Sequence, residues 1–404
     1  MVNCEVRIMN NSKLYYTASA LYTIGITFCT GTILQAYMLN IGVSESNIYL
    51  YTSLLQAIQF ISIFLSLFYI DKLRKVKKII AFCELSPLLI VFLLIYSIFA
   101  NSGAEIFQIF LILSILSFFF TGIYGTICYR FPYEIIPMAE FGKLTATSAI
   151  ISGGLSFLMS TVYSVLNSNF DFKIINGIFF ILAGVCLLGA FYFTNCCREI
   201  SIQENTILTK HKFDFSVLKN RTTHILIVPN FLRGVAVGII NLLPVIGVSM
   251  KIVDSKQVTI LAGIACLSSL FGNYLFINMQ EKTTLPKILI GASVAVFITL
   301  PLSIVFNNSI LFIVLYFLII TMVRTIDTVI PVSVCRVIPY NQIGSFSSIR
   351  MMLFTLGQSV SPLLMNKVLP LIGYFWLLII AGLMLLICCG GYSISLKRSQ
   401  KNEQ

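Results

Sequence analysis

The chain has 404 residues, of which 58% are hydrophobic and only 10% are charged, against roughly a quarter charged in an average soluble domain. Because the apolar runs recur along the whole sequence, this composition excludes a soluble enzyme with a single anchor. The formal net charge of +12 does not indicate a nucleic-acid partner, since in a membrane protein the position of each Lys and Arg matters more than their sum.

Twelve apolar runs follow one another along the sequence, each near the roughly 20 residues that a helix needs to cross a bilayer. The first run is too long for the core of a signal peptide, so we expect it to be a retained span. The expected spans are 15 to 37, 48 to 70, 79 to 100, 106 to 129, 143 to 166, 174 to 195, 224 to 247, 257 to 279, 287 to 306, 309 to 335, 346 to 366 and 371 to 393. The sequence thus predicts an all-α integral membrane protein with 12 transmembrane helices.

The basic residues predict the orientation of these spans. The predicted outer loops hold only Lys173, Lys251, Lys256 and Lys367, while Arg233 and Arg324 lie inside spans. The other 21 of the 27 Lys and Arg residues fall in inner segments if both termini are cytoplasmic. Because cytoplasmic loops carry an excess of Lys and Arg, we expect a multi-pass protein of the cell (plasma or inner) membrane with both ends inside.

The two halves of the sequence resemble each other across a polar linker at 196–223. Ile41-Gly42-Val43-Ser44 recurs 205 residues later at 246–249, IIPMAEFG around Pro137 recurs 202 residues later as VIPYNQIG, and Ala183-Gly184 recurs 198 residues later. Three similar shifts at corresponding places predict two pseudo-symmetric six-helix bundles, residues 1–195 and 224–404, the second with a short cytoplasmic tail.

The loop between the second and third spans carries a family motif. Leu67 to Val76 reads LFYIDKLRKV and is followed by two more lysines. This resembles the G-x-x-x-D-R-x-G-R-R signature of the major facilitator superfamily (MFS), although Lys72 replaces the first Arg and both glycines are absent. The resemblance implies the MFS fold and a transporter, and it implies a gating role for Asp71, Lys72 and Lys75 at helix ends. For the lysines, a solvated basic loop is the alternative.

In the resembled family, spans one, four, seven and ten surround a central cavity. The polar faces of these spans therefore supply the predicted substrate contacts. The predicted substrate contacts with uncharged side chains are Tyr16, Thr23, Thr27, Thr30, Thr121, Asn230 and Asn241. The alternative for each hydroxyl is a hydrogen bond to its own helix backbone.

Three charged residues lie inside predicted spans: Arg233, Arg324 and Asp327. A charge at the bilayer centre costs at least about 2.5 kcal/mol, so each should have a partner. Arg324 and Asp327 are three residues apart and can pair on one helix face. Two positive charges against one negative leave an excess that can bind a carboxylate or phosphate, so we expect Arg233 and Arg324 to bind substrate. The alternative is an internal ion pair that only orders the second bundle.

Asp327 is the leading candidate for proton coupling, and Glu84 in the third span is the second. For Asp327, the alternative is a permanent ion pair, in which case transport is uniport or solute exchange. A Glu84 side chain that reaches toward the basic cytoplasmic loop is the alternative for the second.

The motifs of enzymes are missing from the sequence. The chain has two histidines, both at or beside the linker, no P-loop, no Ser/His/Asp set, and 11 cysteines without metal-ligand spacing. We therefore expect no enzyme, no cofactor and no metal. The G-P-x-x-G-G antiporter pattern is also absent from the fifth span, where Ser152-Gly153-Gly154 stands.

The function predicted from these features is secondary active transport of a small polar or anionic organic solute by alternating access. Protons are the candidate coupling ion, as symport or antiport, and the protein is expected to work as a monomer in the lipid bilayer with no nucleic-acid partner. Two alternatives stay open: efflux of drugs or other hydrophobic compounds by the same fold, and a transporter-like sensor that binds a solute without moving it.

Overall fold

The structure is a computed structural model, and it describes residues 2–66, 68, 76–99, 103–128, 131, 135, 141–198, 221–280, 282–338 and 343–403. Within these ranges all regular elements are helices, and no strand occurs. The chain divides into two compact units, of which the first comprises residues 1–43 and 58–212 and the second comprises residues 44–57 and 213–404.

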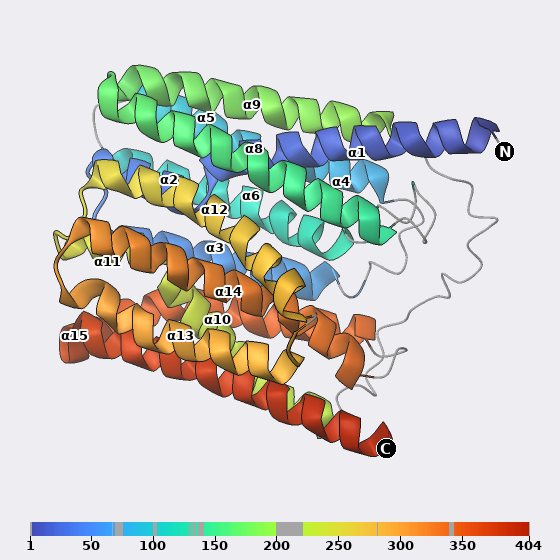
Figure 1. Ribbon diagram of the computed structural model, residues 1–404. Helices are drawn as coiled ribbons and strands as arrows, with labels where there is room; N and C mark the ends of the chain where they lie inside the picture. The colour runs from blue at the N-terminus through green and yellow to red at the C-terminus, as the bar shows by residue number, and fades with distance from the viewer. Residues whose placement is uncertain are drawn as a thin grey trace. The chain divides into compact units, whose positions relative to one another are not determined.

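The first unit is built around the long N-terminal helix. Helix α1 packs against α8 and α9, which lie beside it in Figure 1, and α4 and α5 pack against both α6 and α9. Its helices are α1 (Val2–Cys29), α2 (Gly31–Asn40), the end of α3 (Glu45–Ser66), α4 (Lys77–Leu85), α5 (Leu88–Phe99), α6 (Gly103–Ile127), α8 (Phe141–Asn169) and α9 (Phe172–Cys196).

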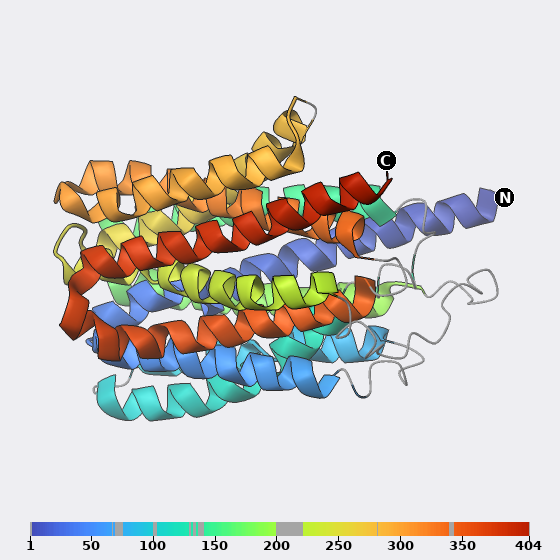
Figure 2. The same ribbon diagram turned by 90° about the horizontal axis from the view of Figure 1, so that it is seen from below.

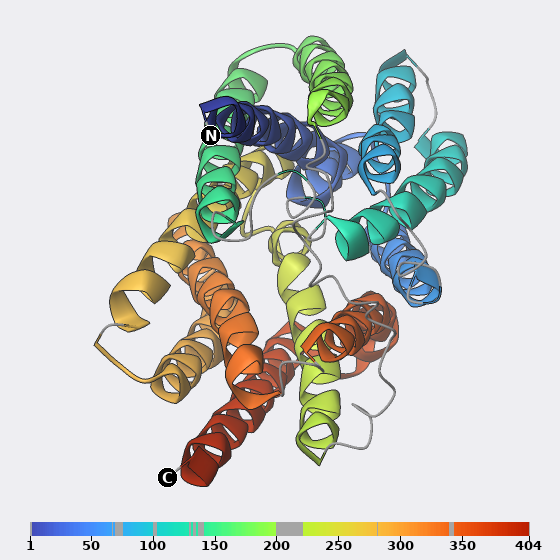
Figure 3. The same cartoon turned by 90° about the vertical axis from the view of Figure 1, so that its right-hand side faces the viewer.

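The second unit is built around α10 and α15, which make the most extensive helix-to-helix packing in the described chain. Figure 3, which looks along the helices, shows α10 beside the arms of α15. The first part of α3 also belongs here, where the Ser53 hydroxyl donates to the Ser359 carbonyl of α15. The remaining helices are α10 (Arg221–Asn241), α11 (Leu243–Ser249), α12 (Ser255–Gln280), α13 (Leu285–Val305), α14 (Ser309–Val337) and α15 (Ile343–Glu403).

The predicted twelve-span, all-α membrane architecture is confirmed. Eleven segments in the described chain are long and apolar enough to cross a membrane, and one of them, Ser345–Arg398, has 54 residues. That segment is α15, which doubles back on itself (Figure 2) and contains a non-helical residue, Gly373, with φ 75° and ψ 168°. Because glycine tolerates positive φ, Gly373 permits this turn, which lies just inside the predicted span 371–393 and not in the loop before it.

Helix α9 shows why these sequences form membrane spans. Its buried face carries Phe180, Ala183, Leu187 and Ala190, and its opposite face exposes equally apolar side chains. Those exposed residues are Ile174, Ile178, Ile181, Val185, Leu188 and Tyr192. A helix that is apolar all round can leave one face exposed without penalty only when that face meets lipid.

In the described part of the chain, three spans are interrupted rather than continuous. Span one breaks at Thr30, which has extended backbone angles, and Gly31, which has φ 64°. Span three breaks between Leu85 and Leu88, where Pro87 cannot donate a helix hydrogen bond. Span seven breaks at Leu242, between α10 and α11, and Pro244 lies in the first turn of α11 directly after the break. Such breaks free backbone groups inside the membrane and recur at transporter binding sites.

Side chains of the first unit also fix the end of α9. The Lys77 ammonium donates to the carbonyl oxygens of Asn195 (3.2 Å) and Cys197 (3.0 Å). A cation at this position is stabilised by the negative end of the helix dipole. The Asn11 amide donates to the carbonyls of Ile135 and Arg198, both at 2.8 Å. These contacts tie the start of the central linker to the first unit.

Candidate functional site

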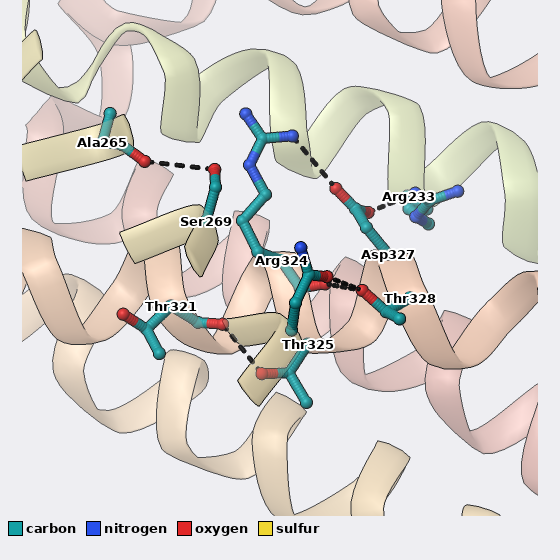
Figure 4. Close-up of polar contacts among 9 residues, drawn as sticks. Arg233, Ala265, Ser269, Thr321, Arg324, Thr325, Asp327 and Thr328 are labelled. Carbon is teal, nitrogen blue, oxygen red and sulfur yellow. Dashed lines mark hydrogen bonds and ion pairs between the residues drawn. The ribbon is translucent and has the colours of Figure 1, made fainter. Parts of the chain in front are cut away.

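The three predicted charged residues of the second unit form one cluster. Arg233 extends from α10, and Arg324 and Asp327 extend from α14, so that the Asp327 carboxylate lies between the two guanidinium groups (Figure 4). Arg233 Nη2 donates to Asp327 Oδ1 in a short ion pair. Arg324 Nη1 lies 3.5 Å from Asp327 Oδ2, the outer limit of a hydrogen bond. Asp327 therefore holds Arg233 closely and Arg324 loosely.

The two arginines differ strongly in exposure. The Arg233 side chain is 6% exposed, whereas that of Arg324 is 49% exposed. Arg233 Cζ also lies 4.4 Å from the centroid of the Phe354 ring on α15, a cation–π contact that compensates part of its desolvation. Arg233 is thus enclosed by protein on two sides. Of the five N–H donors of Arg324, only Nη1 has a hydrogen-bond acceptor among the described residues.

A close approach of α10 to α15 explains how Arg233 reaches Phe354. A Cβ atom at Gly234, the next residue, would overlap the Phe354 carbonyl oxygen. Only glycine permits the two backbones to come this near, as in other small-residue contacts between membrane helices. The position of the buried guanidinium therefore depends on the absence of a side chain beside it.

A second close approach places Arg324. At Gly272 of α12, an added Cβ would lie 2.8 Å from Arg324 Cβ and 2.8 Å from the Thr321 carbonyl oxygen. Thr325 Oγ1 donates across this contact to the Gly272 carbonyl at 3.2 Å. One turn away, Thr328 Oγ1 and Asn273 Oδ1 are 2.7 Å apart. Helix α12 thus supports the α14 face that carries Arg324 and adds an exposed amide, Asn273, beside it.

The cluster carries one more positive than negative charge. An uncompensated charge in a membrane span requires a partner from protein, water or ligand. Among the described residues, Arg324 is the arginine of the cluster whose ion pair is long and whose side chain is exposed, so it is the group that a ligand could reach. A planar carboxylate or phosphate matches the guanidinium fork, so the arrangement can bind an anion.

The predicted amide ligands of the second unit fall in different environments. Asn230 is 1% exposed, its Oδ1 accepts from the Tyr392 hydroxyl at 2.9 Å, and its Nδ2 donates to the Leu226 carbonyl at 2.6 Å. The protein therefore occupies both ends of this amide. Asn241 is exposed at the end of α10, directly before the break in span seven. Of the two, only Asn241 is placed to meet a solute.

The predicted threonine ligands of the first unit bond to their own helices. Thr23, Thr27, Thr30 and Thr121 each donate to the carbonyl four residues earlier, at distances between 2.6 and 3.1 Å. Each hydroxyl proton is thereby used, and only the oxygen lone pairs are left for a ligand. Tyr16 packs against a hydrophobic cluster that includes Val76, Ile80 and Ile127. Thr30 differs from the others because it lies at the break in span one.

Glu84 is enclosed within the first unit. Its side chain is 3% exposed at the end of α4, one residue before the interruption of span three, and Oε2 has no hydrogen-bond partner among the described residues. Glu84 also forms no ion pair with any described residue. Most of the basic loop lies outside the described residues, so the coupling role of Glu84 and its alternative, a side chain that reaches toward that loop, both stay predictions.

The predicted gating residues Asp71, Lys72 and Lys75 lie outside the described residues, so their role stays a prediction. Within the described ranges no three His, Cys, Asp or Glu side chains come together as a metal-binding group.

Sequence reasoning missed Phe354, Asn273 and the ion pair between Arg233 and Asp327. That ion pair joins residues 94 positions apart, and an i, i+3 spacing on one helix pointed to Arg324 instead. Phe354 is one of 33 phenylalanines and had no distinguishing neighbour in sequence. Asn273 carried a weak signal, since an amide inside an apolar run is uncommon.

The fold and site agree with a family comparison. A family model described as Major Facilitator Superfamily matches residues 16–362. The chain therefore belongs to this superfamily of membrane transporters, and the predicted family is confirmed. No curated protein matches the chain in sequence.

Solved structures with the same fold are distant in sequence. A crystal structure of a D-xylose-proton symporter aligns with a TM-score of 0.72 at 13% identity, over 96% of this chain and 97% of that one. A crystal structure of the nucleoside transporter NupG aligns with a TM-score of 0.65 at 15% identity, over 96% and 99% of the two chains. At these identities the likeness concerns the fold and not the solute.

Proposed function

We propose that this protein is a secondary active transporter that moves a small organic anion by alternating access. The observation that carries the proposal is the unequal pairing in the charge cluster, which leaves Arg324 half exposed with one contact at 3.5 Å. A carboxylate or phosphate group on the solute would take the place that Asp327 fills only loosely. Asn273 and Asn241, both exposed, can add hydrogen bonds to the polar part of the solute.

The same geometry supports proton coupling through Asp327. In its charged form Asp327 competes with the solute for Arg324, whereas in its protonated form it leaves both arginines without a counter-charge. An anion would then bind more tightly to the protonated site. By thermodynamic reciprocity the proton and the anion favour each other's binding, which favours symport over antiport.

Glu84 is the second proposed coupling residue. Its burial without an ion pair sets it apart from structural carboxylates, which are usually paired. A carboxyl group inside a membrane span is a functional candidate by default. Glu84 becomes the leading candidate if Asp327 proves to be a permanent partner of Arg233.

Solute flux into proteoliposomes, with and without an imposed pH gradient, tests this function. The proposal expects gradient-driven accumulation of an organic anion by the wild type. It expects Asp327→Asn to lose accumulation while exchange of labelled for unlabelled solute continues. Accumulation that survives in Asp327→Asn would remove Asp327 from coupling, and binding without any flux would identify a sensor instead of a transporter.

The proposal also specifies the orientation: both termini lie in the cytoplasm of a cell with this protein in its plasma or inner membrane. The distribution of Lys and Arg supports it. A reporter fused after Gln404 that is active only in the cytoplasm should give signal. Signal from a reporter active only outside would reverse the orientation.

A further inference from the structure

A strip of polar side chains lies where α12 packs on α14 within the second unit. It consists of Ser269 and Asn273 on α12, and of Arg324 and Thr328 on α14. Residues four apart lie on one face of a helix, so each helix contributes one polar face. The close approach at Gly272, where an added Cβ would lie 2.8 Å from Arg324 Cβ, brings the two faces together. We call these four residues the polar strip.

The polar strip lies inside two membrane spans and is nevertheless accessible. The spans are Gln257–Gln280 and Ser309–Val334. Asn273 and Arg324 are exposed, and Ser269 and Thr328 are partly exposed. A guanidinium group and an amide in hydrocarbon would lose their hydrogen bonds to water at a high cost in free energy. We therefore expect these side chains to face water or a solute rather than lipid.

The hydroxyl protons of the polar strip are used within the helices. Ser269 Oγ donates to the Ala265 carbonyl at 3.1 Å, and Thr328 Oγ1 donates to the Arg324 carbonyl at 2.9 Å (Figure 4). A hydroxyl group has one proton and two lone pairs, so these oxygens can still accept hydrogen bonds but no longer donate them. They are therefore suited to groups that donate, such as the hydroxyls of a solute.

The same count of protons orients the amide of Asn273. Its Oδ1 lies 2.7 Å from Thr328 Oγ1, whose single proton already goes to the Arg324 carbonyl. The oxygen and nitrogen of an amide differ little in shape, so the hydrogen-bond network decides between its two orientations. A rotation of the amide by 180° lets Nδ2 donate to Thr328 and satisfies both contacts. Asn273 Oδ1 then becomes a further acceptor on the accessible side.

We propose that the transported anion carries hydroxyl groups next to its charged group, and that Asn273 and Ser269 select them. This inference rests on the proposed function, in which Arg324 binds the anionic group. The solute class that meets both demands is a hydroxylated organic anion, such as a sugar acid or a sugar phosphate. An unsubstituted carboxylate would leave the acceptors without donors, and a neutral polyol would leave Arg324 without an anion.

Affinities of the purified protein for matched pairs of anions test the proposal. Gluconate and hexanoate have equal numbers of carbons and the same carboxylate, and ribose 5-phosphate and pentyl phosphate form a second pair with the same phosphate. Within a pair, the oxygen substituents differ and the charged group does not. A neutral hydrogen bond corresponds to about fivefold in affinity, so two should make the hydroxylated member of at least one pair bind about 25-fold more tightly.

Two variants identify the residues that make the distinction. Asn273→Leu removes the amide with little change in volume, and it should weaken binding of the hydroxylated anion about fivefold. Ser269→Ala should have a similar effect. Neither variant should weaken binding of the unsubstituted anion.

Asn278→Leu is the matched control. Asn278 lies on the same helix and is partly exposed, but it is five residues beyond Asn273 and so lies on another face of α12. This variant should bind both members of a pair as the wild type does.

Two results would overturn the proposal. Equal affinities within every pair would show that the site does not recognise hydroxyl groups. An equal loss for both members of a pair in Asn273→Leu would show that Asn273 acts on the packing of α12 and not on the hydroxyls. The proposed anion site fails separately, when Arg324→Gln binds the same anions as tightly as the wild type.

Discussion

Arg233 and Asp327, 94 residues apart in sequence, form an ion pair that joins α10 to α14. The arginine is buried against the Phe354 ring, and the aspartate still reaches toward a second arginine. The ion pair with Arg233 gives Asp327 a structural role. Its loose contact with Arg324 gives it a second role, because a bound solute can replace that contact. The two roles can be separated by substitution.

Asp327→Asn should destabilise the protein, because it leaves Arg233 buried without its counter-charge. Breaking a buried pair typically costs about 3–5 kcal/mol. If Arg324 were the main partner of Asp327, as the spacing of three residues on one helix suggests, Arg324→Gln would restore stability. Because Arg324 is 49% exposed and Arg233 only 6%, Arg233→Gln should be the better rescue. Melting temperatures of the two double variants compare these partners. Equal or better rescue by Arg324→Gln would contradict the assigned pairing.

Gly234→Ala should disturb the packing of α10 on α15. The new methyl group would overlap the Phe354 carbonyl oxygen, and overpacking of this kind costs about 1–3 kcal/mol. Gly291→Ala on α13 is the control, since no atom lies within 4 Å of the added Cβ. The control should match or slightly exceed wild-type stability, because alanine favours helix by up to about 1 kcal/mol. A melting temperature for Gly234→Ala equal to that of the control would show that the helices do not meet so closely.

Glu84→Gln should leave the fold intact, because the neutral amide has the shape of a protonated carboxyl group and Glu84 has no ion pair to lose in the described chain. Its melting temperature should therefore stay near that of the wild type. If Glu84 carries a proton, accumulation driven by a pH gradient should fall while solute exchange persists. Glu45→Gln, at the partly exposed start of α3, is the control. Loss of stability as large as that of Asp327→Asn would instead indicate an ionised, paired Glu84.

Two adjacent cysteines at the end of α9 should react at different rates. Cys196 is exposed, whereas burial raises the pKa of the Cys197 thiol to about 12. Because the thiolate is the nucleophile, a raised pKa leaves very little reactive Cys197 at neutral pH, and its rate should rise about tenfold per pH unit below that value. Peptide mapping after brief maleimide treatment measures both sites. Equal labelling at neutral pH would contradict the contacts that enclose Cys197.

The sequence was sufficient for the spans and the family, and for locating the charged residues of the site. Apolar runs of bilayer length are local signals, and so is an unusual Arg or Asp inside such a run. These signals found Arg233, Arg324 and Asp327. They also predicted the turn that the structure places at Gly373.

The arrangement of the site could not be predicted in the same way. Which arginine holds Asp327 depends on how α10, α14 and α15 pack, and this depends on close approaches such as that at Gly234. Helix faces rich in hydroxyl side chains were also poor predictors of substrate contacts, because a threonine that bonds to its own helix has the same sequence spacing as one that faces a solute. Thr23 and Thr27 illustrate this.

Ligand binding to the purified protein tests whether Arg324 binds the anionic group of the solute. Melting temperatures of the wild type and of Arg324→Gln would be measured with small organic carboxylates and phosphates, and with neutral sugars and nucleosides. A ligand stabilises the native state in proportion to its occupancy. This role of Arg324 predicts that an anionic compound raises the melting temperature of the wild type and not that of Arg324→Gln. Stabilisation by a neutral solute alone, equal in both proteins, would contradict it.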